Sequence, residues 1–234
     1  MTEVAAVVPA AGSARRMGAM GDKLYLDLNG RPVLARTLQS LQAAGDLGIG
    51  RIVVAVAAGA RERFQRVVRP HLAPTPAVTV VEGGATRQES VRRALAAAAP
   101  ATWALVHDGA RPLVPREVLA RCIEAARAGR CAVAGLPVKD TLKEVDGGGR
   151  VVGTAVRERL WAVQTPQIFP LDTLAGAHQQ AARDGFLGTD DAVLVERMGI
   201  DVYVVEGAEV NLKITTPHDL LVAEILLRQG AAGR

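Results

Sequence analysis

Short apolar runs alternate with longer amphipathic stretches along most of the chain. The runs are rich in β-branched residues and predict strands at residues 4–8, 52–57, 78–82, 103–107, 131–137 and 202–206. The amphipathic stretches predict helices at residues 32–44, 61–69, 86–98, 115–128, 171–182, 190–198 and 217–228. Near-continuous apolar strands that alternate with helices are typical of a parallel sheet covered on both faces. The pattern therefore predicts an α/β fold with a mostly parallel sheet.

Two short segments around a glycine turn interrupt this alternation. Residues 141–145 and 150–154 flank Asp146 and the three glycines of 147–149, which predicts a β-hairpin. A hairpin with so few apolar residues is not stable alone. It either lies on the sheet of its own chain or forms an arm that builds a dimer. No repeat or long linker divides the chain, so we expect one domain over residues 1–234 with the hairpin at about 138–157.

The composition limits the classes of protein to consider. The 234 residues are 49% hydrophobic and 22% charged, which fits a folded domain with a sizeable core. No apolar run approaches the roughly 20 residues that span a bilayer, and the first run lacks the basic flank of a signal peptide. We therefore expect a soluble, cytoplasmic protein without a membrane partner. The net charge of +4 suits an anionic ligand, and an aromatic content of 3% argues against nucleic acid.

The cysteines and histidines do not form a metal-binding pattern. Cys122 and Cys131 are nine positions apart without a nearby histidine, a spacing that matches no zinc signature. The four histidines are scattered along the chain. We expect both cysteines to be unreactive core residues and expect no site for a transition metal built by the protein alone.

The segment after the first predicted strand combines small and basic residues. Small residues at 9–12 let backbone N–H groups approach an anion, and Arg15, Arg16 and Lys23 follow. This composition indicates a polyphosphate-binding loop or, alternatively, a solvated basic loop. The Walker and dinucleotide-binding patterns are both absent, because Lys23 precedes a leucine and no second glycine stands two positions after Gly12.

Polar residues also follow the third and fourth predicted strands. The glycines at 83–84 allow close backbone approach ahead of Thr86, although a helix start alone would explain them. Asp108 lies at the end of its strand with Arg111 three residues on, where a divalent cation or a sugar hydroxyl would bind. The alternative is an Asp-Gly turn that serves conformation only.

Two later segments carry further candidates. Trp161 is expected in the core, whereas residues 165–167, Thr-Pro-Gln, have no evident packing role. Lys213 lies among apolar neighbours after the last predicted strand. Its aliphatic stem could simply cover apolar surface, but Lys is rare in a chain whose 28 basic residues are mostly Arg.

Five motifs occur in order along the chain. They are P-A-A-G at 9–12 with Arg16 and Lys23, G-G-x-x-R-x-x-S at 83–90, H-D-G-A-R-P at 107–112, Leu-Trp leading into T-P-Q at 165–167, and N-x-K-I-T at 211–215. In this ordered set the chain resembles the 2-C-methyl-D-erythritol 4-phosphate cytidylyltransferases of the non-mevalonate isoprenoid pathway. Each motif alone is weak, but the set is specific and covers nearly the whole sequence.

The resemblance implies a Rossmann-like nucleotidyltransferase fold and a homodimer whose subunits exchange the hairpin arm. It implies transfer of CMP from CTP to 2-C-methyl-D-erythritol 4-phosphate with Mg²⁺. Nucleotide binding would fall to Ala10, Ala11, Gly12, Gly83, Arg87 and Ser90. Catalysis and positioning of the phosphates would fall to Arg16, Lys23, Arg157 and Lys213. The second substrate would contact Asp108, Arg111, Thr141 and Thr165, with Asp108 also a candidate metal contact. The partner subunit would donate Arg111, Thr141 and Arg157.

The chain departs from the family pattern in its first loop. Ala14 stands where a second glycine is usual, and Asp22 and Leu24 flank Lys23 in place of proline and glutamine. A carboxylate beside Lys23 could compete for its charge. Two alternatives therefore accompany the resemblance: a cytidylyltransferase for another polyol phosphate, such as ribitol 5-phosphate, and a non-catalytic CTP-binding regulator.

The chemistry of this reaction is consistent with the residues present. A phosphate monoester is anionic at pH 7, so as a nucleophile it needs no general base. The sequence accordingly has no pattern typical of a Ser-His-Asp or Cys-His nucleophile. The reaction needs fixed cations that bring two polyanions together, and the five motifs supply them.

Overall fold

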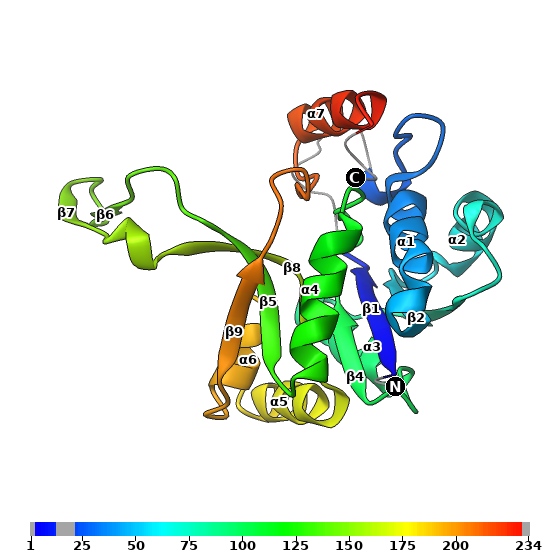
Figure 1. Ribbon diagram of the computed structural model, residues 1–234, viewed down its shortest axis with the longest axis horizontal. Coiled ribbons are helices and arrows are strands. Elements are labelled where there is room, and N and C mark those ends of the chain that lie inside the picture. Colours follow the sequence, from blue (N-terminus) through cyan, green and yellow to red (C-terminus); the bar gives the residue numbers. More distant parts are fainter. Residues whose placement is uncertain (1–2, 13–21, 231–234) are drawn as a thin grey trace.

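A seven-stranded sheet lies at the centre of the part that the computed structural model describes, residues 3–12 and 22–230 (Figure 1). Its strand order is β3-β2-β1-β4-β8-β5-β9. The strands are β1 (Val4–Ala10), β2 (Ile49–Val56), β3 (Ala77–Glu82), β4 (Trp103–Val106), β5 (Cys131–Pro137), β8 (Trp161–Pro170) and β9 (Val202–Glu206). The helices are α1 (Val33–Ala43), α2 (Arg61–Val67), α3 (Arg87–Ala96), α4 (Arg116–Arg127), α5 (Leu171–Arg183), α6 (Ala192–Glu196) and α7 (Pro217–Arg228). The predicted α/β class is confirmed.

The connectivity creates a topological switch point in the middle of the sheet. The chain runs from β1 outward through β2 to β3, all parallel, and then returns to β4 on the other side of β1. The connections from β1 and from β4 therefore leave the sheet side by side at its carboxyl edge. In open α/β sheets this is the place where ligands bind.

Helices cover both faces of the sheet, as the sequence predicts. In β1, Val4, Ala6 and Val8 pack with apolar residues of α1, α2 and α4. Ala5 and Val7 point the other way and pack with α3, α5 and α6. Because successive side chains of a strand alternate between faces, a strand buried on both sides must be apolar throughout. Cys122 and Cys131 are buried in these two layers, as expected, and burial raises the pKa of the Cys122 thiol to about 12.

The strand β8 is the main element that the hydrophobic pattern did not predict. It runs antiparallel between β4 and β5, with a register shift against β5 between Val133 and Gly135. The expectation that Trp161 is a core residue is wrong, because this side chain is 40% exposed at the start of β8. Trp161 pairs with Pro137 at the very end of β5, next to the hairpin arm, where the sheet ends.

The predicted hairpin is present and projects away from the sheet, at the left of Figure 1. Its strands β6 (Lys143–Val145) and β7 (Val151–Thr154) pair only with each other within the described chain. The Asp146 carboxylate accepts hydrogen bonds from the backbone N–H groups of Gly148 and Arg150, both at 3.0 Å, which closes the turn. The exposed apolar side chains of the arm and its root are Leu142, Val145, Val151, Val152, Val156, Trp161 and Val163.

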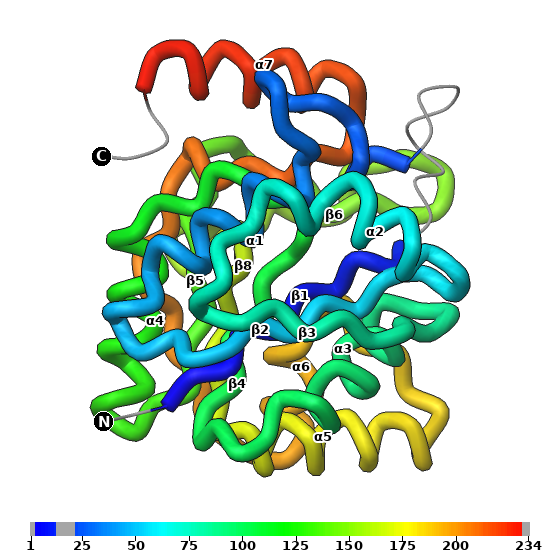
Figure 2. The backbone as a smooth tube through the Cα atoms, turned by 90° about the vertical axis from the view of Figure 1, so that its right-hand side faces the viewer, coloured from blue at the N-terminus to red at the C-terminus, as the bar shows by residue number. Residues whose placement is uncertain are grey.

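The last helix, α7, lies across the end of the molecule near the loop before α1 (Figure 2). Leu220 and Ala223 of α7 pack with Leu28, Leu113 and Ile214. Thr216 caps α7 and completes a capping box with Asp219. This packing fixes the segment just before the helix, at residues 211–215, against the loop that follows β4. No helix in the described ranges is long and apolar enough to cross a membrane.

Candidate active site

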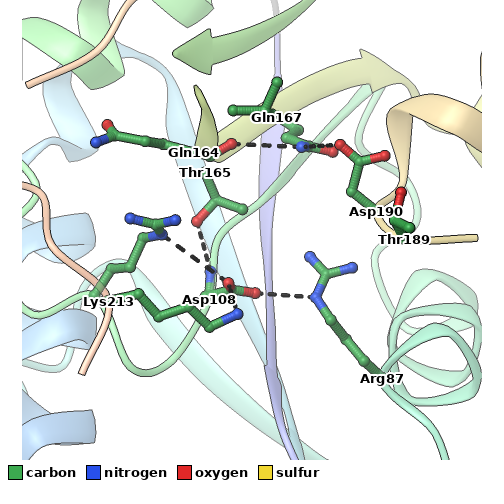
Figure 3. A pocket seen from close by; sticks show the side chains of 10 residues that line it. Arg87, Asp108, Gln164, Thr165, Gln167, Thr189, Asp190 and Lys213 are labelled. Atoms are coloured by element: carbon green, nitrogen blue, oxygen red, sulfur yellow. Dashed lines mark hydrogen bonds and ion pairs between the residues drawn. The ribbon is translucent and has the colours of Figure 1, made fainter. Parts of the chain in front are cut away.

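Two adjoining cavities open at the switch point, beyond the carboxyl ends of β1 and β4. One, of about 230 Å³, is lined by residues that include Gly12, Lys23 and Ser90. The other, of about 270 Å³, is lined by Arg87, Asp108, Arg111, Val163, Gln164, Thr165, Gln167, Thr189, Asp190 and Lys213 (Figure 3). Arg87, Asp108 and Lys213 line both cavities. We call these three residues the shared wall.

Asp108 is the centre of the shared wall. Its Oδ1 accepts from Nε of Arg87 at 3.0 Å, and its Oδ2 lies 2.6 Å from Nζ of Lys213 and 4.0 Å from Nε of Arg111 (Figure 3). Burial alone would raise the pKa of Asp108, but the charges of Arg87 and Lys213 outweigh it and lower that pKa. The wall thus presents more positive than negative charge, which suits a polyanionic ligand on either side.

The turn after β4 is fixed by a buried histidine. Burial lowers the pKa of His107 to about 4, so its ring is neutral at pH 7 and has one donor and one acceptor nitrogen. Nε2 lies 3.1 Å from the carbonyl oxygen of Arg111 and donates to it. Nδ1 accepts from the Thr165 hydroxyl at 3.1 Å, and that oxygen accepts from the Asp108 N–H at 3.0 Å. This chain of bonds fixes Asp108 relative to β8.

The segment before α7 joins several cations of the site. Nζ of Lys23 donates to the carbonyl of Ile214 at 2.8 Å, and Nη1 of Arg111 donates to the carbonyl of Asn211 at 2.6 Å. The Asn211 amide donates to the carbonyl of Thr165 at 2.8 Å. Because Asn211 is fully buried, these bonds hold the backbone around Lys213 in one position.

The glycine turn after β3 packs tightly against the end of β1. A Cβ atom on Gly83 would lie 2.5 Å from Cβ of Ala11 and 2.9 Å from Oγ of Ser90, so only glycine fits here. Ser90 donates to the carbonyl of Thr86 at 2.8 Å, while Thr86 caps α3 through the Glu89 N–H. The first turn of α3 thereby carries Arg87 into the shared wall.

The negative charge of Asp22, beside Lys23 in the sequence, is compensated by another cation. Its carboxylate accepts from the Leu24 N–H at 3.2 Å and lies 3.7 Å from Nη1 of Arg63 in α2. The Arg63 guanidinium also lies 3.9 Å from the centre of the Tyr25 ring. Arg63 therefore balances the charge of Asp22, the residue that departs from the family pattern.

The structure brings together most of the residues expected from the sequence. Those that line one or both cavities are Ala11, Gly12, Lys23, Arg87, Ser90, Asp108, Arg111, Thr165 and Lys213. Ala10 and Gly83 lie directly behind this lining. Arg111 lines the cavity of its own chain, contrary to its expected donation by a partner, because the Asn211 carbonyl anchors its guanidinium there.

Two expected residues of the described chain are not part of these cavities in the single chain. Thr141 and Arg157 belong to the hairpin arm and its root, where Arg157 donates to the Lys139 carbonyl at 3.1 Å. Arg16, together with the departure at Ala14, lies outside the described residues.

Five residues outside the expected site set also line the 270 Å³ cavity: Val163, Gln164, Gln167, Thr189 and Asp190, of which Gln167 belongs to the T-P-Q motif. The Gln167 amide donates to Asp190 at 2.8 Å and accepts from the Ala192 N–H at 3.2 Å (Figure 3). The available signal was Thr-Asp-Asp at the start of a predicted helix, a pattern typical of a helix cap. Gln167 reaches Asp190 only because β8 lies antiparallel beside β4.

The residues around Asp108 do not fit a metal site built by the protein. Both carboxylate oxygens already accept from cations, and all three charged neighbours of Asp108 are positive. Across residues 3–12 and 22–230, no three Asp, Glu, His or Cys side chains gather in a way that could hold a metal ion. Magnesium usually takes one or two carboxylates plus substrate phosphates. The carboxylate of Asp108 is instead the counter-ion of the shared wall.

An α/β sheet with two cationic cavities at its switch point defines a protein that binds phosphate esters. The family model for IspD, 2-C-methyl-D-erythritol 4-phosphate cytidylyltransferase, matches residues 4–229. The chain therefore belongs to the IspD family, in agreement with the resemblance read from the five motifs.

Related proteins and structures agree with this assignment. The chain is 46% identical over 231 residues to a 2-C-methyl-D-erythritol 4-phosphate cytidylyltransferase of Symbiobacterium thermophilum, covering 97% of this chain and 94% of the other. It is 44% identical over 222 residues to the enzyme of that name from Bacillus pumilus, with 94% and 95% covered. The crystal structure of a Thermus thermophilus protein of the same name has a TM-score of 0.79 at 39% identity, with 97% and 99% covered.

Proposed function

We propose that the chain transfers the CMP group of CTP to 2-C-methyl-D-erythritol 4-phosphate, giving 4-diphosphocytidyl-2-C-methyl-D-erythritol and pyrophosphate. Membership of the IspD family supports this reaction. The structural observation that carries it is the shared wall, whose two cations and one carboxylate separate two cavities of similar volume. Two phosphate-bearing substrates that bind these side chains from adjoining cavities would meet at them.

The cavities can be assigned to the two substrates. The 230 Å³ cavity contains the backbone of the first loop at Gly12, the Lys23 ammonium and Ser90, which suit a triphosphate and its nucleoside. The 270 Å³ cavity contains Arg111, Thr165 and Gln164, which suit a phosphate and several hydroxyl groups. CTP would occupy the first cavity and the methylerythritol phosphate the second.

The reaction is an in-line displacement at the α-phosphorus of CTP. An oxygen of the substrate phosphate forms the new P–O bond, and the bond from the α-phosphorus to the bridging oxygen of the β-phosphate breaks. Pyrophosphate leaves with that electron pair. Since the nucleophile is already an anion, the enzyme supplies position and positive charge. Lys23, Lys213 and Arg16 would stabilise the charge that accumulates at the reacting phosphate.

A divalent cation would enter as part of the CTP complex. The oxygen atoms of Asp108 are occupied by Arg87 and Lys213, so the triphosphate itself is the better source of ligands for Mg²⁺. The residues of this chain would then hold the nucleotide complex by its remaining phosphate oxygens and its backbone contacts at Gly12.

The arm supports a homodimer of single nucleotidyltransferase domains, each comprising residues 1–234 with its arm at about 138–157. Val145, Val151 and Val152 are each more than half exposed, although apolar side chains of a two-stranded hairpin need another surface to be stable. A second copy of the chain would supply that surface. Thr141 and Arg157 would then reach the 270 Å³ cavity of the partner. Both substrates are small soluble anions, which fits an enzyme of the cytoplasm.

The decisive experiment measures pyrophosphate release from CTP and Mg²⁺ with 2-C-methyl-D-erythritol 4-phosphate, with ribitol 5-phosphate, and with neither. Release that depends on the methylerythritol phosphate is the expected result. Release only with ribitol 5-phosphate would keep the chemistry and change the second substrate. CTP binding without release in any mixture would favour a non-catalytic regulator.

A further inference from the structure

Arg87 is held by two buried carboxylates, only one of which belongs to the cavities. Its Nε donates to Asp108 at 3.0 Å, and its Nη1 donates to Oδ2 of Asp191 at 2.8 Å. The Asp191 side chain is only 1% exposed and lines neither cavity. It directly precedes α6, on the side of Arg87 away from the substrates. Arg87 thus connects the shared wall to a charge behind it.

A buried histidine supports Asp191 in turn. Nε2 of His178, in α5, lies 3.0 Å from Oδ1 of Asp191, and the histidine side chain is fully buried. Burial would raise the pKa of Asp191, but the charge of Arg87 and the bond to His178 outweigh it and lower that pKa. The ionised carboxylate requires donors, so Nε2 carries the ring hydrogen.

The surroundings of Nδ1, the other ring nitrogen of His178, are consistent with a hydrogen on Nε2. Nδ1 of His178 has no hydrogen-bond partner within the described part of the chain. In the neutral ring this nitrogen carries a lone pair, which is less costly to bury unpartnered than a charged N–H group. Both oxygens of Asp191 are therefore engaged, one by His178 and one by Arg87, and the carboxylate has a single orientation.

This orientation determines how Arg87 approaches Asp108. Nη1 of Arg87 is held by Asp191 and Nε by Oδ1 of Asp108, so two carboxylates on different nitrogens fix the direction of the guanidinium. Oδ2 of Asp108 lies 2.6 Å from Nζ of Lys213. The direction of Arg87 therefore determines where its positive charge lies relative to the pair of Asp108 and Lys213.

We propose that Asp191 and His178 are positioning residues that orient the Arg87 guanidinium in the shared wall. The proposal rests on the proposed function, in which the wall separates CTP from the second substrate. Neither residue touches a substrate. Both act on the reaction through the direction of the Arg87 guanidinium.

The first test compares three variants by steady-state kinetics of pyrophosphate release. Asp191→Asn removes the charge at nearly constant shape and should lower kcat/KM by about 10- to 100-fold, since a displaced contact of about 1 Å costs up to about 100-fold. His178→Leu removes only the supporting bond and should have a smaller effect. His178→Gln keeps an N–H group for Asp191 and should restore most of the activity. Equal kcat/KM values in the two His178 variants would overturn the proposal. So would a loss of kcat/KM that merely parallels a fall in the thermal midpoint.

A double-mutant cycle tests whether Asp191 acts through Arg87. Arg87→Gln should itself lower kcat/KM, and adding Asp191→Asn should then cost little more, because the side chain to be oriented is gone. Independent losses that multiply in the double variant would show that Asp191 acts by another route. The matched control is Asp184→Asn, which removes a surface carboxylate 3.3 Å from Arg197 near the end of α5. It should retain the wild-type kinetics.

Calorimetric titration of the same proteins with CTP separates this proposal from the proposed function. Arg87 lines the 230 Å³ cavity, so Asp191→Asn should weaken CTP binding about tenfold or more even in the absence of turnover. A wild-type protein that binds CTP without releasing pyrophosphate would refute the function and leave the positioning testable. Wild-type affinity and turnover in Asp191→Asn would refute the positioning and leave the function in place.

Discussion

In the shared wall a buried carboxylate is paired with two partly buried cations, whereas in the hairpin arm apolar side chains are exposed to solvent. An unpaired buried charge and an exposed apolar patch would each make the folded chain less favourable. Asp108 and Arg87 compensate for burial by pairing within the chain. Val151 and Val152 are each more than half exposed. The comparison indicates that the charges of the wall are paired within one chain, whereas the arm presents apolar side chains that another surface could cover.

The largest expected effect comes from removing a cation beside the wall. Lys23→Ala should lower kcat by about 10² to 10³, or about 3–4 kcal/mol, because the ammonium is preorganised for charge that develops in the reaction. Arg16→Ala should have an effect of the same order. Pyrophosphate release under saturating substrates measures both. Circular dichroism and the thermal midpoint should match the wild type, and near-normal turnover in either variant would remove the role assigned to it.

An intermediate effect is expected on the free energy of unfolding at acid pH, through the buried His107 beside the wall. The pKa of His107 is about 4 in the folded protein and about 6.5 in an unfolded chain, so the folded state excludes a proton that the unfolded state binds. Stability is complete above pH 6.5 and falls as the pH drops toward 4, by about 3 kcal/mol from this group. Urea unfolding at pH 7.5 and pH 4.5 measures the loss. His107→Gln should show a correspondingly smaller dependence on pH. An equal dependence in both proteins would contradict the neutral, buried ring.

The smallest effect on the protomer is expected in the arm. Val152→Asp should weaken self-association at least about tenfold, because a charge would have to be buried in the interface. The free energy of unfolding at a concentration where the protein is monomeric should change by less than about 0.5 kcal/mol. Sedimentation velocity over a concentration series measures the first quantity. Ile225→Asp, at an exposed position of α7, is the matched control. Unchanged association in Val152→Asp would mean that the arm is a surface hairpin.

The sequence predicted the parallel part of the fold well because those strands are buried on both faces. The buried part of β2, from Ile52 to Val56, is apolar throughout, and this pattern is visible without any tertiary information. The strand β8 escaped prediction because it contains two prolines and buries polar residues. Its Thr165 and Gln167 are satisfied by His107 and Asp190, partners more than 20 residues away, which local patterning cannot reveal.

The residues of the site also divide into those that local sequence reveals and those that depend on tertiary contacts. Residues that the sequence placed there, such as Gly12 and Asp108, belong to loops directly after strands, where the topology of the sheet predicts ligands. His178 and Asp191 lie within or beside helices and looked like ordinary helical residues. Their importance depends on the packing of α5 and α6 behind α3, which no local pattern of the sequence encodes.

Because the same three side chains line both cavities, the affinities for the two substrates are thermodynamically linked. A phosphate that draws Lys213 away from Asp108 leaves that carboxylate more negative toward the neighbouring cavity. The free energy of binding one substrate therefore depends on whether the other is present. By reciprocity, each substrate would change the affinity of the other by the same factor, and the salt bridge between Lys213 and Asp108 is one contact that would carry this coupling.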